Sequence, residues 1–365
     1  MGDEAGRREE LASRVETYHG VTLEQVLGEV EYLRDAGDSV IAGGSLAYGL
    51  GNHLSDLDLL VAGSTTVESS RVPLEQFVGS LRVDVWKLAQ DLIEETFDRA
   101  EEALESPAAL HGSFGDVDHE TDLKLLHRIA FGVVVDGGGI EPPPGRDYRG
   151  VAAGLVVREY AERMRSSALL AQLALPAARP VVAVVNGRQA VEEALNATIA
   201  SRGLPFSGDK WLRERLAREA GDLAEVYEPF RRLPEDPAVE AARFVEGALA
   251  ACRRLWTLDL TTEALIGAAR WSNTDVRAAT IGDERLLLSK RFGGLWGLDA
   301  KEAEAWDRLA GAADGDESDA SWSLTGCDEE ELALCLRLHE HGLLDLRWSE
   351  GVAIGDLDPV GEVPA

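Results

Sequence analysis

A ten-residue segment of glycine and proline divides this chain into parts of different character. Residues 136–145 hold four glycines and three prolines. Neither type suits the interior of a helix or a strand, because glycine loses more conformational entropy than other residues and proline lacks an amide N–H. At roughly 100–200 residues per domain, a chain of 365 residues makes about two or three domains. We interpret the segment as a linker and predict three domains, at residues 1–138, 146–256 and 258–365.

The charge of the chain excludes some classes of function. It has 36 Lys and Arg residues against 66 Asp and Glu residues, a formal net charge of −30. Tight binding to DNA depends on Lys and Arg releasing counterions from phosphates, so we expect no DNA partner, although one nucleotide could still bind through metal ions. We also expect no membrane span and no secretion signal, because no run of 18 apolar residues and no basic-then-apolar leader occurs. Three cysteines are too few for a disulfide scaffold, which predicts a cytoplasmic protein.

The first domain opens with a helix and three short strands. Thr22 can cap the helix together with Gln25, three residues later. The strand at 39–42 ends in Gly43-Gly44-Ser45, and a helix is predicted to begin there. Glycine lets the backbone approach a ligand closely, and a helix N-terminus offers free N–H groups and positive dipole. Gly43, Gly44 and Ser45 are therefore predicted to hold a triphosphate, with the Ser45 hydroxyl as a further donor.

Three aspartates belong to the next two predicted strands, at 55–61 and 81–86. Asp56 and Asp58 are two residues apart, which places both side chains on one face of a strand. Asp84 lies between two valines and so faces away from them. If the two strands pair, the three carboxylates converge, and hard oxygen ligands of this kind suit Mg²⁺. Two such ions can orient a triphosphate and activate an attacking hydroxyl. The structural alternative is a turn followed by solvated acids in an acidic protein.

This ordered set of motifs resembles the DNA polymerase β-type nucleotidyltransferase superfamily. The family pattern is a hydrophobic residue with Gly-Gly/Ser, a spacer of about ten residues, Asp-hydrophobic-Asp and a later strand Asp. Here Gly44-Ser45, ten intervening residues, Asp56-Leu57-Asp58 and Val83-Asp84-Val85 match it, within a region of about residues 20–135. The resemblance implies an α+β domain with a small mixed sheet and flanking helices, in a bacterial cytoplasmic enzyme. It also implies that Asp56, Asp58 and Asp84 hold two Mg²⁺ ions and that a nucleoside triphosphate, expected to be ATP, is the co-substrate.

The helical region after the linker resembles the substrate domains of aminoglycoside-type nucleotidyltransferases. In that group a Lys before Trp lies at the cleft between nucleotide and substrate, so the resemblance makes Lys210 a candidate phosphate contact. Its alternative is a solvated lysine at a helix start. A general base is harder to place: Glu159 is one candidate, although an ordinary exposed helical glutamate is the plainer interpretation. Because related small-molecule transferases build sites at dimer interfaces, a homodimer is one expected assembly.

The tail follows the outline of a small winged-helix-like module, with helices near 299–309 and 328–341 and a strand at 343–348. It loosely resembles peptide-recognition domains that bind a leader peptide as an added strand. A DNA-reading winged helix fits less well, because the acids at 328–331 would face phosphates. Cys335 and His339, four residues apart on a predicted helix, are a weak zinc signal without paired cysteine spacing. The alternative for Cys335 is a small core residue.

These features lead to two hypotheses of different class. In the first, the chain is an enzyme that transfers a nucleotidyl group from a nucleoside triphosphate to a small molecule or peptide and releases pyrophosphate. A cationic acceptor fits the acidic chain better than tRNA does. In the second, the chain is a nucleotide-binding regulatory or antitoxin-like module that modifies or binds a partner protein. A missing carboxylate would favour the second hypothesis, and none of the three is missing from the sequence.

Overall fold

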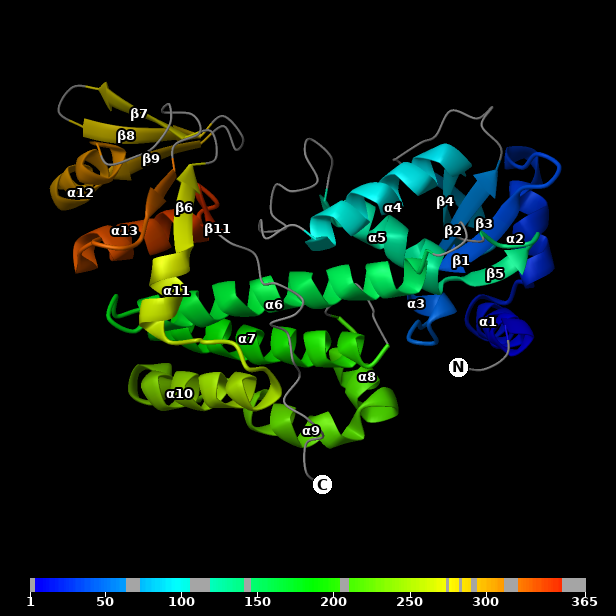
Figure 1. Ribbon diagram of the computed structural model, residues 1–365, viewed down its shortest axis with the longest axis horizontal. Coiled ribbons are helices and arrows are strands. Elements are labelled where there is room, and N and C mark those ends of the chain that lie inside the picture. Colours follow the sequence, from blue (N-terminus) through cyan, green and yellow to red (C-terminus); the bar gives the residue numbers. More distant parts are fainter. Residues whose placement is uncertain are drawn as a thin grey trace. The chain divides into compact units, whose positions relative to one another are not determined.

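A five-stranded mixed sheet occupies the first part of the computed structural model of this chain (Figure 1). The structure describes residues 4–63, 73–105, 119–140, 146–203, 210–273, 276–281, 284–289, 294–311 and 321–349. The strand order is β3-β4-β2-β1-β5, with β2 and β4 parallel and the other neighbours antiparallel. The strands are β1 (Ser39–Gly43), β2 (Leu57–Gly63), β3 (Leu74–Val78), β4 (Leu81–Ala89) and β5 (Val133–Asp136). The predicted small mixed sheet with flanking helices is confirmed.

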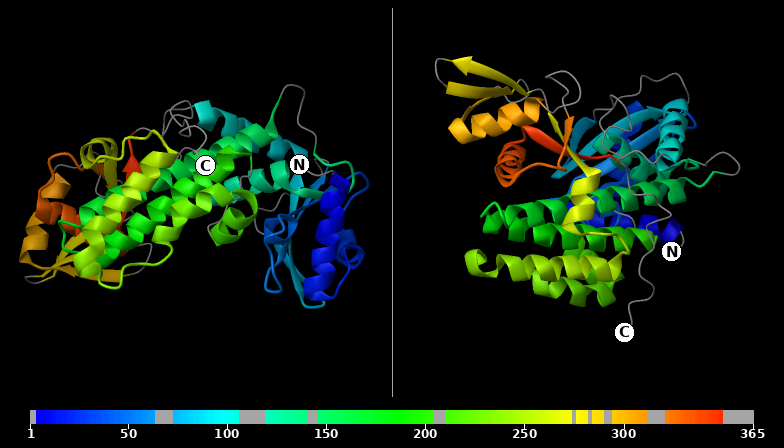
Figure 2. Two further views of the ribbon diagram at one scale, coloured as in Figure 1. Left: turned by 90° about the horizontal axis from the view of Figure 1, so that it is seen from below. Right: turned by 60° about the vertical axis from the view of Figure 1, so that its left-hand side comes forward.

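Helices flank this sheet on both faces. Those before and between the strands are α1 (Glu4–His19), α2 (Leu23–Val30), the 3-10 helix η1 (Glu31–Leu33), α3 (Gly44–Ala47), α4 (Gln90–Glu105) and α5 (His119–Phe131). Figure 1 shows α4 and α5 on one side of the strands and α1 and α2 on the other, and the left view of Figure 2 shows α1 alongside the strands. The start of α2 follows from its sequence, because the Thr22 hydroxyl accepts the Gln25 N–H and the Gln25 side chain accepts the Thr22 N–H.

Alternate residues of the strands form the apolar core on the α1 and α2 side. Leu57, Leu59 and Val61 of β2 are fully buried there with Val83 and Val85 of β4. The core also takes residues from β1, β5 and the two helices: Val40, Ala42, Val133, Val135, Leu11, Val15, Leu23 and Val26. Because side chains alternate along a strand, the residues between these point to the opposite face, where α4 and α5 lie.

The chain is divided into two compact units. The first comprises Met1–Glu105, Phe114–Val157 and Ile199–Ala220, and the second comprises Ser106–Ser113, Arg158–Thr198 and Gly221–Ala365. The division falls within α6 (Tyr148–Ala174) and α7 (Pro180–Ser201), and α8 (Leu212–Glu219) belongs to the first unit. The three-domain organisation stays a prediction, and residues 141–145 of the proposed linker lie outside the described residues.

The second unit is helical at first and then mixed. It holds most of α6 and α7. Its other helices are α9 (Gly221–Tyr227), the 3-10 helix η2 (Glu228–Phe230), α10 (Pro237–Leu255), α11 (Thr262–Ala268), α12 (Ala300–Gly311) and α13 (Glu329–Glu340). Two three-stranded sheets have the orders β10-β6-β11 and β7-β8-β9. Their strands are β6 (Ala269–Asn273), β7 (Val276–Ile281), β8 (Glu284–Ser289), β9 (Gly294–Leu298), β10 (Ser321–Ser323) and β11 (Leu344–Trp348).

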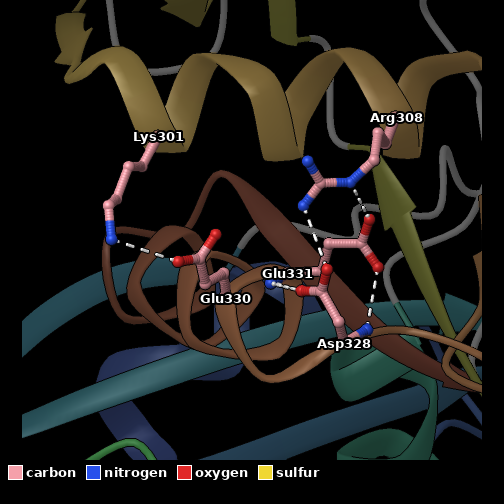
Figure 3. Close-up of polar contacts among 5 residues, drawn as sticks. All are labelled: Lys301, Arg308, Asp328, Glu330 and Glu331. Atoms are coloured by element: carbon pink, nitrogen blue, oxygen red, sulfur yellow. Dashed lines mark hydrogen bonds and ion pairs between the residues drawn. The ribbon is translucent and has the colours of Figure 1, made fainter.

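Polar contacts tie α12 to the start of α13 in this unit (Figure 3). Asp328 caps α13 by accepting the Glu331 N–H at 2.9 Å, and the Glu331 carboxylate accepts the Asp328 N–H at 2.9 Å. Arg308 of α12 reaches both acids, at 2.7 Å from Glu331 and 3.1 Å from Asp328. The cap therefore serves two purposes, since it starts α13 and holds α12 against it. The winged-helix-like assignment of this part stays a prediction.

No helix in the part of the chain that the structure describes has the length and apolar composition needed to cross a membrane.

Candidate active site

Two of the predicted carboxylates lie side by side in the five-stranded sheet. Asp58 on β2 is the register partner of Asp84 on β4, so their side chains leave the same face of adjacent parallel strands. Both residues are buried, with exposed fractions of 8% and 6%. Asp56 differs from the prediction, because β2 begins at Leu57 and Asp56 precedes the strand, where it is half-buried. The strand prediction for 55–61 therefore began two residues too early.

The glycine bend lies directly against Asp58. Gly43, the last residue of β1, is the register partner of Asp58, and Gly44 follows with a positive φ of 73°. A Cβ on Gly44 would overlap Oδ2 of Asp58. Glycine is required here for two independent reasons, since the backbone is left-handed and the carboxylate occupies the space of a side chain.

The predicted helix after this bend is short, and Ser45 is buried within it. Helix α3 has four residues, so its dipole is small. Ser45 is buried, and its carbonyl accepts the N–H groups of Leu50 and Gly51, each at 2.9 Å. The structure thus brings Gly43 and Gly44 to Asp58, and it uses the Ser45 backbone to close the turn that follows α3.

An arginine that sequence reasoning missed completes this cluster. Arg128, in the last turn of α5, donates from Nη2 to Oδ1 of Asp58 at 2.9 Å. Its guanidinium carbon lies 4.0 Å from the centroid of the Trp86 ring, a cation–π contact. Gly43 makes room for its stem, because a Cβ on Gly43 would lie 2.6 Å from Cγ of Arg128. The one signal in the sequence is a basic residue near the end of the helix that leads into β5.

A second arginine holds Asp84. Arg82 lies two residues earlier on β4 and donates to both oxygens of Asp84, at 3.0 and 2.9 Å. It also pairs with Glu75 of β3 at 3.0 Å, and Glu75 is the register partner of Asp84. Because β3 was not predicted, this fourth carboxylate was missed. Its position next to Asp84 follows from the β3–β4 hairpin.

The electrostatics of the site show that its acids are coupled. Burial raises the pKa of Asp58 above its ordinary value, and the charges of Asp56 and Asp84 raise that pKa further, whereas Arg128 opposes the shift. Asp56 therefore interacts with Asp58 although it lies outside the strand. The hydrogen bonds with Asp84 raise the pKa of Arg82, and the charge of Asp56 also contributes. Negative charge gathered in this way favours binding of a cation.

The fit to a divalent metal ion is partial. Carboxylate oxygens are suitable donors for Mg²⁺, and the mutual repulsion of the three aspartates favours such an ion. Within the described ranges, however, no group of three or more His, Cys, Asp or Glu side chains is arranged to hold a metal. Two of the three acids, Asp58 and Asp84, each pair with an arginine. The donors are present, but a metal would have to displace a guanidinium from them.

The other predicted residues lie elsewhere. Lys210 is exposed just before α8, and its ammonium nitrogen lies 5.4 Å from the centroid of the Trp211 ring. Glu159 is half-buried on α6, in the second unit. Their roles as a phosphate contact and a general base stay predictions.

The residues of the weak zinc signal have other surroundings. Cys335 is fully buried, which raises the pKa of its thiol. His339 has its Nδ1 2.8 Å from the carbonyl oxygen of Leu344. Burial also raises the pKa of Cys327 to about 11. These are the surroundings of a core thiol at Cys335, a half-buried thiol at Cys327 and a histidine packed at the end of its helix.

Comparison with known proteins gives little further information. No protein-family model and no curated protein matches the chain. A solved structure described as a nucleotidyltransferase-like protein, from Exiguobacterium sibiricum 255-15, aligns with 70% of this chain and 78% of its own, at 12% identity and a TM-score of 0.33. A TM-score this low does not establish a shared fold, so the function of this chain has to be argued from its own site.

Proposed function

We propose that this chain is a nucleotidyltransferase that uses Mg²⁺ and a nucleoside triphosphate. The observation that carries the proposal is the placement of Asp58 and Asp84 in register on adjacent parallel strands, with the Gly44 backbone against the Asp58 carboxylate. Buried acids side by side are costly unless a cation neutralises them. The glycine bend beside them has no side chains of its own, so its backbone lies close to the Asp58 carboxylate. That combination suits a metal-bound triphosphate better than a structural ion pair.

The proposed roles follow from these positions. Asp56, Asp58 and Asp84 hold the metal ions, and Gly43 and Gly44 let the phosphates approach closely. Ser45 lies in the same bend, and Lys210 is a further candidate phosphate contact. The ions, when bound, neutralise the triphosphate and lower the pKa of an acceptor hydroxyl. Asp84 is also the proposed group that accepts the acceptor's proton, a role that requires Arg82 to release at least one of the two Asp84 oxygens that it now binds.

The acceptor class is inferred from charge. The chain carries a formal net charge of −30, which repels polyanionic acceptors such as tRNA and attracts cationic ones. We therefore propose a small cationic molecule or a basic peptide as the acceptor, with ATP as the first triphosphate to test.

Pyrophosphate release tests the proposal. We expect pyrophosphate release with Mg²⁺ and at least one of the four common nucleoside triphosphates. The rate of release should fall about 100-fold or more in Asp58→Asn and Asp84→Asn, since a catalytic metal contributes several kcal/mol. Asp136→Asn is the matched control, because Asp136 pairs with Arg34 on the same sheet away from the bend. Equal activity in Asp58→Asn and in the control would contradict the proposal.

One observation favours a second candidate, a nucleotide-binding regulatory module. Asp58 and Asp84 each pair with an arginine, so these two carboxylates have a counter-ion without a metal. A chain of this second kind would bind a triphosphate but release no pyrophosphate with any metal or acceptor. Calorimetry with each triphosphate, run beside the release assay, separates the two candidates.

A further inference from the structure

Arg128 and Arg82 are the two arginines at this site to which the proposed reaction gives no role. The side chain of Arg128 is 15% exposed, it touches Asp58 and Trp86, and its stem passes over Gly43. We propose that Arg128 is a resident counter-ion, which occupies Asp58 while no divalent cation is present and turns to the triphosphate when the cation binds. This inference rests on the proposed function, because it assumes that the bend receives phosphates.

One oxygen of Asp58 is hydrogen-bonded, and the other is sterically confined. Oδ1 accepts from Arg128 at 2.9 Å, and Oδ2 lies against Gly44, where a Cβ would overlap it. A divalent cation bound to Oδ1 of Asp58 would share that oxygen with the Arg128 guanidinium, which is hydrogen-bonded to it. Two cations in a buried site repel strongly, because little water screens them. Binding of the metal and the contact of Arg128 with Asp58 are therefore competitive.

The side chain of Arg128 can change partner without movement of its helix. The Arg128 carbonyl accepts the Gly132 N–H at 2.9 Å, which fixes the end of α5. A Cβ on Gly43 would lie 2.6 Å from Cγ of Arg128 and 3.2 Å from Cβ and Cδ, so the whole stem runs beside the bend. A guanidinium that leaves Asp58 consequently remains next to Gly43 and Gly44. Its planar fork of donors is suited to phosphate oxygens.

Arg82 provides the contrast that singles out Arg128. Arg82 is bound by two carboxylates, Asp84 and Glu75, and its side chain is 47% exposed. If a metal took Asp84, Arg82 would keep Glu75. Arg128 has one carboxylate partner among the described contacts, and the Trp86 ring stabilises its charge without neutralising it. The loss of Asp58 leaves Arg128 as the cation that most needs a new anion.

The test compares Arg128→Gln with wild type in Mn²⁺ binding, followed by the electron paramagnetic resonance of free Mn²⁺ without nucleotide. We expect the variant to bind Mn²⁺ about tenfold more tightly, within the usual range of coupling between two sites. In the presence of saturating Mg²⁺ we expect its affinity for ATP to fall about tenfold, because a charge-assisted contact is lost. Arg34→Gln is the matched control, since Arg34 also pairs with an aspartate of the sheet region, Asp136, and is expected to change neither value.

The outcomes separate this inference from the proposed function. Equal or weaker Mn²⁺ binding by Arg128→Gln overturns the inference, whether or not wild type releases pyrophosphate. Tighter Mn²⁺ binding with unchanged ATP affinity also overturns it, because the guanidinium then has no second partner. Absence of pyrophosphate release by wild type, with the Mn²⁺ and ATP effects present, contradicts only the transferase. If Arg128→Gln does not fold, Arg128→Lys replaces it. We then expect tighter Mn²⁺ binding and weaker ATP binding again, by smaller factors, because lysine lacks the planar fork.

Discussion

The two faces of the five-stranded sheet are built from alternate residues of the same strands and both bury apolar side chains, yet only one of them also buries acids. On one face Leu57, Leu59 and Val83 are fully buried against α1 and α2. On the other face Asp58 and Asp84 carry buried charge, held by Arg128 and Arg82. A shift of one residue in register would exchange the faces, so both depend on one alignment of β2 with β4.

The comparison teaches that the acids are confined to one face of the sheet, beside buried apolar residues such as Leu60 and Leu88. Apolar burial on both faces supplies free energy of folding, and the second face also holds acids that cost free energy to bury. Substitutions of core residues away from the acids should therefore change stability, whereas substitutions beside the acids should also change the proposed activity, and the following predictions test this.

The largest expected effect on stability is that of Leu59→Ala on the apolar face. Removal of a fully buried leucine side chain should lower the free energy of unfolding by about 2–5 kcal/mol, because it removes apolar contacts and leaves a cavity. Leu74→Ala is the control, since Leu74 is a leucine of the same sheet that is exposed on β3. Urea denaturation measures both, and an equal loss in the two variants would break the distinction between the faces.

The next effect is that of Gly44→Ala on the charged face. Left-handed backbone costs alanine about 1–2 kcal/mol, and here the new Cβ also collides with Asp58. Gly20→Ala is matched to it, with a φ of 68° and nothing within 4 Å of the added Cβ. We expect the larger loss of stability and the loss of pyrophosphate release in Gly44→Ala alone. Parallel behaviour of the two variants would show that Asp58 is not confined by the bend.

A smaller effect is expected at Trp86, which stacks on Arg128 from the charged face. Trp86→Leu removes a cation–π contact of about 0.5–2 kcal/mol, so Arg128 should release Asp58 more easily. Mn²⁺ binding without nucleotide should then become a few-fold tighter, in the same direction as for Arg128→Gln. Trp86→Phe, which keeps a ring, should stay close to wild type. A change of equal size in both variants would mean that packing, rather than the ring, is responsible.

The smallest effect concerns His19 at the end of α1, on the apolar side. Burial lowers the pKa of His19 from 6.5, the charge of His53 lowers it further, and no hydrogen bond to its Nε2 is found among the described residues. Because the unfolded chain then binds the proton more readily, stability should fall as the pH drops through about 6.5 and be fully kept above it. His19→Gln should reduce this fall, measured as the difference in urea midpoint between pH 7 and pH 5.5. An unchanged difference would contradict the assignment.

Local sequence patterns predict much of this sheet. The alternation of acids with Leu57 and Leu59, and of Asp84 with its valines, predicts the strands and the face on which the carboxylates lie. The Thr22–Gln25 capping box, confirmed in α2, depends on residues three apart and is visible without any tertiary structure. Signals of this kind are local, so they survive without knowledge of the fold.

The partners of the carboxylates could not be predicted in the same way. Arg128 reaches Asp58 from 70 residues away, and the sequence does not show which helix returns to which strand. Strand β3 reads Leu-Glu-Gln-Phe-Val with only Val78 buried, so it lacks the apolar signal of an internal strand. With β3 missing, Glu75 could not be placed beside Asp84. The sequence shows which acids are present, but it does not show which distant residues pair with them.

The pairing of β1 with both β2 and β5 has a consequence for synthesis of the chain. Strand β2 leaves the ribosome soon after β1, but β5 ends at Asp136, so one border of β1 stays open while the intervening segments emerge. An open strand border invites pairing with other nascent chains. A ribosome that pauses before it has translated Asp136 should therefore favour aggregation. A pause just after the whole sheet has emerged from the ribosome should not.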